Sequence, residues 1–159
     1  MELKERLLTV ERVCQVTKGR RYFSFSVIVI KGNQNGIIGY GLGKSFDISE
    51  AIHKAGEQAT KNLVKISIYK GTIPHEQSAK FGGSKIFIRP ASEGTGIIAC
   101  CAMRAVLEMA GISNVLSKSK GSSNHHNVVK ATIKALINLR NANIIAKERG
   151  IHIKKVFNG

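Results

Sequence analysis

An almost wholly apolar segment, Ile97 to Ala110, constrains the fold of this chain more than any other stretch. It follows a Gly-rich turn, residues 89–96, and stops at Gly111. Because it is too short to span a bilayer, it predicts a buried helix that anchors a domain. Arg104 and Glu108 interrupt it one helical turn apart, a spacing at which they would pair.

The Gly-rich turn before this helix has a second interpretation. It would present free backbone N–H groups at a helix N-terminus to an anion such as an RNA phosphate. Both interpretations stay open, because one end of a buried helix can reach the surface.

Charge narrows the classes of partner. The 159 residues include 25 Lys and Arg against 10 acidic residues, a net charge of +15. Both halves of the chain are basic, so the charge is not confined to a tail. This balance favours nucleic acid or an anionic membrane surface as partner. Asp47 is the single aspartate. Mg²⁺-dependent or paired-carboxylate chemistry needs several carboxylates that converge on one site, and this sequence offers few of them.

The cysteines and histidines do not form a metal motif. Cys14, Cys100 and Cys101 lack CxxC spacing, which argues against disulfides and structural zinc and predicts small core residues in a reducing compartment. His125 and His126 are adjacent and would diverge by ~100° on a helix, so no metal site is expected. Near a helix N-terminus they would instead face a phosphate. The first residues contain acids and no long apolar run, so no signal peptide is expected.

Residues 3–66 predict three antiparallel strands followed by one helix. Residues 7–16 and 22–30 form a hairpin, and residues 37–42 follow an Asn-Gly turn as the third strand. Asp47 caps the helix, with Glu50 in capping-box position. The apolar stripe of this helix is Ile48, Ala51, Ile52, Ala55, Ala59 and Leu63; Lys54, Lys61 and Lys65 lie on another face.

A domain boundary is expected near residues 70–74, with a second domain over 75–150 and a basic tail over 151–159. Its expected elements are strands at 66–69, 85–88 and 114–119, a polar segment at 74–84, the anchoring helix, a turn at Gly121–Asn124, and helices at 126–141 and 144–149.

The Gly-rich run from Gly39 to Ser45 invites comparison with a phosphate-binding loop. It is one residue too short for that motif, and no aspartate follows a later apolar strand to hold Mg²⁺. The better interpretation is a strand whose backbone approaches a neighbouring element or an RNA backbone.

A basic hairpin tip is the strongest candidate site. It comprises Lys18, Gly19, Arg20 and Arg21, and in a chain of this charge it predicts phosphate contacts. Aromatic residues make up 6% of the chain and mostly occupy alternating strand positions, a core pattern. Recognition of phosphates and RNA shape is therefore expected instead of base stacking.

Five motifs, taken in order, resemble one family: bacterial-type small-subunit ribosomal protein five. They are VxRVxxVxKGxRxFSF, GNxNGxxGxGxGK, RPASEGTGIIA, AMRAVLEMAGIxNVLxKxxGSxN and NVVKAT. The resemblance extends from about Leu7 to Lys147. It implies an α+β fold: a double-stranded-RNA-binding-like β-β-β-α domain, then an α/β two-layer sandwich.

The resemblance also implies a function. Members are structural constituents of the small ribosomal subunit, not enzymes, and need no cofactor. They bind small-subunit rRNA, contact ribosomal proteins four and eight, lie near the mRNA entry path, and influence head–body arrangement and accuracy. A cytoplasmic ribosome is the expected location, with an organellar ribosome left open, and no membrane partner is expected.

The resemblance and the charge pattern together extend the candidate RNA-binding set beyond the hairpin tip. The added residues are Lys44, Lys54, Lys61, Lys120, Ser122, Ser123, Asn124 and Lys130. The chain departs from the family pattern at Arg20, at Cys100–Cys101 and at His125–His126, where Gly, Gly-Gly and a Pro are expected. These departures concern the loop shape, the packing of the apolar helix and the start of the last long helix.

Two other classes of function remain open from the sequence. One is a phosphate-dependent enzyme that uses Gly39–Ser45, and it requires a nucleotide site. The other is a free-standing duplex-RNA-binding module that acts outside the ribosome. That module would bind generic RNA duplexes as tightly as small-subunit rRNA.

Overall fold

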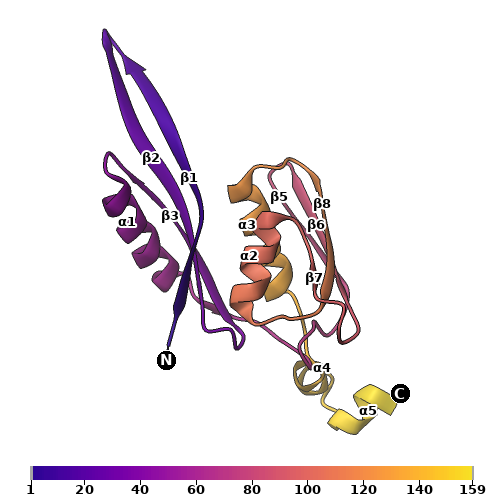
Figure 1. The fold of residues 1–159 in the computed structure, drawn as a ribbon. Helices are drawn as coiled ribbons and strands as arrows, with labels where there is room; N and C mark the ends of the chain where they lie inside the picture. Colours follow the sequence, from indigo (N-terminus) through magenta and orange to yellow (C-terminus); the bar gives the residue numbers. More distant parts are fainter. Residues whose placement is uncertain (1, 159) are drawn as a thin grey trace.

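The computed structural model describes residues 2–158, and the side chains of Gln15 and Arg21 lie outside the described part. Within it the chain forms two four-stranded sheets and five helices (Figure 1). The predicted α+β class is therefore confirmed. No helix of this described part combines the length and apolarity that a membrane crossing requires.

The first sheet is antiparallel, with the order β1-β2-β3-β4. Its strands are Lys4–Thr17 (β1), Arg20–Gly32 (β2), Ile37–Ser45 (β3) and Val64–Lys65 (β4), and helix α1 (Ile48–Lys61) packs on one face. The predicted hairpin, third strand and helix are present. Lys65 belongs to β4 and not to the helix, and residues 66–69 are not a regular strand; both predictions were wrong.

Helix α1 begins as predicted at Asp47, whose side chain accepts a hydrogen bond from the Ser49 amide at 3.3 Å. Its buried side is a row of alanines, Ala51, Ala55 and Ala59. Ile48 is exposed, so the predicted stripe is narrower than expected.

Three glycines of β3 explain why that row is made of alanine. A Cβ atom on Gly41 would lie 1.9 Å from the Ala55 carbonyl oxygen, and Cβ atoms on Gly39 and Gly43 would also lie too close to carbonyl oxygens of α1, at 2.5 and 2.1 Å. Strand and helix therefore touch through backbone atoms. The contacting pairs are Gly39 with Ala59, Gly41 with Ala55 and Gly43 with Ala51. The run is a packed strand and not a nucleotide loop, and the element it approaches is α1.

The second sheet has the order β5-β6-β8-β7, with β7 parallel to β8 and the other pairs antiparallel. Its strands are Gln77–Phe81 (β5), Ser84–Pro90 (β6), Ile97–Ile98 (β7) and Val115–Gly121 (β8). Helices α2 (Cys101–Ala110) and α3 (His125–Ile137) lie between it and the first sheet (Figure 1). Helices α4 (Ala142–Arg149) and α5 (Ile153–Asn158) end the chain.

Helix α2 is the shared centre of the molecule. Its end receives backbone hydrogen bonds from the turn after β2: Gln34 N to Met109 O at 3.1 Å and Gly36 N to Ala110 O at 3.0 Å. One core cluster contains residues of both sheets and of this helix, including Met103 at 0% exposure. The predicted buried helix is therefore confirmed, and it joins the two halves.

The start of this helix differs from the prediction. Ile97 and Ile98 form β7, and the first helical residue is Cys101. Glu108 contacts Arg6 of β1 and not Arg104. The Gly-rich turn therefore precedes a strand, and within it the Gly96 amide already donates to Asn114 Oδ1 at 3.0 Å. The turn does not present a helix N-terminus to an anion.

One further helix was predicted wrongly, because the helix expected over 126–141 ends at Ile137. The segment 74–84, predicted only as polar, contains strand β5, and part of the predicted basic tail forms α5. Asn141 begins a new helix, because its side chain accepts a hydrogen bond from the Ile144 amide at 2.8 Å.

Candidate nucleic-acid interface

The β1–β2 hairpin extends past the rest of its sheet. Its last pairing with β3 is Phe25 with Ser45, and beyond that pair only two strands continue to the tip (Figure 1). At the tip Lys18 and Arg20 are exposed, and Gly19 adopts φ +76° with open space around it. The backbone at Arg21 belongs to β2, and its side chain is outside the described part.

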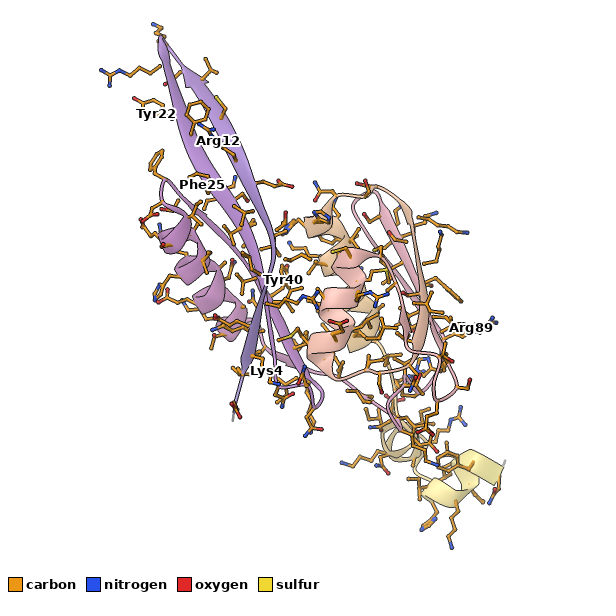
Figure 2. All side chains as sticks on the ribbon, in the orientation of Figure 1. Lys4, Arg12, Tyr22, Phe25, Tyr40 and Arg89 are labelled. Atoms are coloured by element: carbon orange, nitrogen blue, oxygen red, sulfur yellow. The ribbon has the colours of Figure 1, made fainter. Side chains whose placement is uncertain are left out.

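The two-stranded extension has an unusually apolar surface. Arg12 lies 3.9 Å above the Phe23 ring, a cation–π contact, and Tyr22 is 41% exposed (Figure 2). Val16, near the tip, is 75% exposed. A two-stranded ribbon without other cover is marginally stable in water, so this extension exposes apolar side chains and a cationic end that the rest of the described chain does not cover.

The predicted lysines of the first half lie away from the tip, on α1 and β3. Lys54 pairs with Glu50 at 3.0 Å, and hydrogen bonds from Lys54 and then Ser45 lower the pKa of that carboxyl. The positive charge of Lys54 is therefore partly offset by Glu50. Lys44 and Lys61 are exposed and form no ion pair within residues 2–158.

Two predicted residues of the β8–α3 turn, Ser122 and Asn124, make hydrogen bonds within the chain. Asn124 caps α3 by accepting from the His126 amide at 3.0 Å, and Ser122 Oγ accepts from the Asn124 amide at 3.3 Å. Ser123 is exposed. Lys130 lies 4.7 Å above the Phe81 ring. The N-terminus of α3 is thus capped by Asn124, although His125 and His126 stand where the family pattern has a proline.

His126 lies between the two halves of the molecule. Its ring meets Tyr40 of β3 edge-on at 6.1 Å, and its Nδ1 atom is buried without a hydrogen-bond partner. Burial, and then the charge of Lys130, lower the pKa of His126. Its ring therefore faces the first sheet at the junction between the two halves.

The cysteine prediction was wrong, because all three cysteines are exposed. Cys14 lies on the two-stranded extension, where no other element covers it. Cys100 and Cys101 line a surface hollow of about 330 Å³ together with Ser122 and His125. Within residues 2–158 no group of three or more His, Cys, Asp or Glu side chains is placed to hold a metal ion.

The aromatic prediction was also wrong, because most aromatic rings are exposed by 41% or more. Tyr22 and Phe23 lie on opposite faces of the two-stranded extension, which no other strand or helix of the described chain covers, and Phe87 lies on the exposed face of β6. The other three exposed rings lie outside the strands. The exposed rings are Tyr22, Phe23, Phe46, Tyr69, Phe87 and Phe157.

The candidate residues thus fall into three separate groups: the hairpin tip, the α1–β3 side and the β8–α3 side. Sequence reasoning missed several cations on the second sheet, although the alternation of the segment SKIFIRP marks every second residue there as exposed. Of that sheet's outward cations, it named Lys120 alone.

Comparison with known proteins decides the family. The model described as "Ribosomal protein S5, N-terminal domain" matches residues 3–67, and "Ribosomal protein S5, C-terminal domain" matches residues 79–149. The chain belongs to the ribosomal protein S5 family. Membership confirms the resemblance and the two-part α+β architecture, and it places the chain among ribosomal proteins, not enzymes.

Relatives of this family match the whole chain. "Small ribosomal subunit protein uS5" of Bacteroides thetaiotaomicron is 62% identical over 159 residues, covering 100% of this chain and 92% of the relative. The proteins of the same name from Karelsulcia muelleri and Flavobacterium psychrophilum are 63% and 58% identical, covering 100% of this chain and 94% and 91% of those relatives.

Proposed function

We propose that this S5-family protein is a structural constituent of the small ribosomal subunit and binds its rRNA through phosphate contacts. The relatives named for that subunit support this assignment. The cytoplasmic ribosome would be its location, and no cofactor would be needed.

The projecting hairpin is the observation that carries the RNA-binding role. A ribbon with Lys18 and Arg20 at its tip can enter a gap between RNA elements where a compact surface cannot. Gly19 lets the chain turn tightly, so that both cations stand at the end. Their contacts would be electrostatic, and binding should weaken steeply as salt rises.

The finer roles are proposals of the same kind. The hairpin would lie at the junction of the subunit's head and body, near the mRNA entry path, and would affect accuracy. Ribosomal proteins four and eight would be neighbours. Additional contacts with rRNA would come from the α1–β3 and β8–α3 sides. The predicted domains 3–66 and 75–150 would each contribute an RNA-binding surface.

The test measures binding of the full chain to a small-subunit rRNA transcript at several salt concentrations. Lys18→Ala with Arg20→Ala should lower affinity and reduce the slope of log K against log salt by about 0.9 for each duplex phosphate that the tip no longer neutralises. Lys70→Ala, a basic residue with positive φ in the connection between the halves, is the control. An unchanged slope would show that the tip does not touch phosphate.

Competition separates this proposal from a free-standing RNA module. A generic RNA duplex of equal length should displace the rRNA transcript poorly. Equal displacement would favour the module that acts outside the ribosome.

A further inference from the structure

The second sheet has one face that nothing else in the described chain covers. Helices α2 and α3 pack on its inner face, where Ser84, Ile86 and Ile88 of β6 are buried. The alternate residues Lys85 and Phe87 are exposed on the opposite side. Figure 1 shows α2 and α3 on the inner side of this sheet and α4 and α5 beyond its lower end. We call this outward surface of β5, β6, β8 and β7 the outer face.

The outer face is crowded with cations. The strand register places Lys80, Lys85 and Lys120 opposite one another in a single row across β5, β6 and β8. Like charges directly opposite each other in a sheet destabilise it. In the next row Lys118 stands opposite Phe87. Such an arrangement in the free chain is unfavourable unless an anion lies over it.

Few carboxylates of the chain relieve this repulsion. Glu76 pairs with Arg89 at the end of β6, at 2.6 Å. Figure 2 shows Arg89 on the side away from the helices. The four lysines of the outer face form no ion pair among the described residues. The face therefore carries a net positive charge that the chain leaves uncompensated.

An exposed aromatic ring lies among these cations. Phe87 is 43% exposed, with Lys85 and Arg89 two residues before and after it on the same strand and Lys118 opposite. Ile98, on the neighbouring edge of the sheet, is 52% exposed and adds apolar surface. A flat ring surrounded by lysines is the combination that single-stranded nucleic acid uses, because bases stack on the ring and phosphates meet the cations.

We propose that the outer face binds an unpaired segment of RNA, with a base stacked on Phe87 and the phosphates held by the surrounding lysines. The inference rests on the proposed function and adds a second RNA surface to the hairpin. An unpaired segment fits better than a duplex, because a duplex keeps its bases stacked inside and offers none to the ring. An acidic protein segment could pair with the lysines, but it would not account for the exposed ring of Phe87, which a nucleic-acid base can stack on.

The test uses the full chain and a fluorescein-labelled oligouridine of about 12 nucleotides, followed by fluorescence anisotropy. Phe87→Ala should weaken binding by about 5- to 150-fold, the range for removal of one stacking ring. Phe87→Trp should restore it. Phe157→Ala is the matched control, because Phe157 is 64% exposed but belongs to α5, outside the outer face; its affinity should not change.

The lysines give a second readout. Lys85→Gln with Lys118→Gln should reduce the salt slope by about 0.7 for each single-strand phosphate that these lysines no longer neutralise. Thermal unfolding checks that each variant is folded. Affinity of Phe87→Ala within twofold of the unmodified chain would overturn the proposal, and so would an acidic peptide that displaces the oligouridine and loses affinity in the same variants.

The outcome is distinguishable from failure of the proposed function. If the hairpin variants weaken rRNA binding while Phe87→Ala leaves oligouridine binding unchanged, the outer-face proposal fails alone. If the hairpin variants have no effect while Phe87→Ala weakens binding, the hairpin assignment fails and the outer face stands.

Discussion

The two sheets of the molecule have the same number of strands but are covered differently. In the first sheet, α1 lies on one face and α2 on the other, and the run Val27 to Ile30 is buried at every residue. In the second sheet, helices cover one face, and β6 alternates between buried and exposed residues. A strand between two helical layers becomes continuously apolar, whereas a strand covered once keeps a free face. In this chain the free face is cationic, and the proposed RNA contact of the outer face rests on that difference.

Neighbouring residues of β6 test the difference most strongly. Ile88→Ala should lower the free energy of unfolding by about 2 to 5 kcal/mol, because Ile88 is fully buried against the helices. Phe87→Ala should cost about 1 kcal/mol or less, since its ring lies largely in solvent. Urea unfolding measures both. Equal losses would mean that the second sheet is covered on both faces in the free chain.

The glycine–alanine contact tests the first sheet. Gly41→Ala should destabilise the chain by about 2 to 3 kcal/mol. The new methyl group would clash with the carbonyl oxygen of Ala55 and force α1 away from β3. Gly83→Ala is the control, since its Cβ atom would meet only the Ser122 side chain, at 3.3 Å. A tolerated Gly41→Ala would show that strand and helix are not in backbone contact.

The junction between the halves should respond to pH through His126. Its pKa is lowered in the folded chain, so the unfolded chain binds a proton more readily in the window just below the ordinary value of about 6.5. Above that window the histidine is neutral in both states and has no effect. As the pH falls through it, stability should decline.

The matched variant for this pH effect is His126→Phe, which keeps a ring against Tyr40. Thermal unfolding at pH 7.5 and 5.5 should show a smaller decrease in melting temperature on acidification in the variant than in the unmodified chain. An equal decrease in both would assign the pH response to other groups.

The smallest effect is expected at the ion pair between the first sheet and α2. Arg6 and Glu108 have side chains that are 40% and 38% exposed, so Glu108→Gln should cost about 0.2 to 1 kcal/mol. The loss should diminish in high salt. A cost of several kcal/mol, measured by urea unfolding, would mean that this pair and not the shared apolar core holds the halves together.

Local patterns predicted the elements that local chemistry determines. The hairpin, the Asp47 cap and the Gly111 stop follow from alternation, side-chain capping and a left-handed glycine. Strand β5 was missed, because QSAKF lacks β-branched residues and its strand character comes from pairing with β6. Ile97 was assigned to the helix, because a continuous apolar run does not show where a strand ends and a helix begins.

The candidate site was predicted less completely, for a related reason. Lys18 and Arg20 stand together in the sequence, so the hairpin tip was visible as a charge cluster. Lys120 is far along the chain from Lys80 and Lys85, and only the strand register brings the three into one row. The sequence did not show that the side chain of Asn124 caps α3, since a turn residue and a capping residue look alike in a sequence; its RNA contact stays a prediction.

The ribosomal assignment is tested most simply by following a tagged copy of the full chain, in its own cell, through a sucrose gradient at high salt. Proteins held on ribosomes by surface charge alone should wash off, because phosphate contacts weaken steeply with salt. A structural constituent of the small subunit should remain with it, because contacts from several separate surfaces act together and dissociate less readily than any one of them. Recovery of the chain at the top of the gradient, free of the subunit, would contradict the assignment.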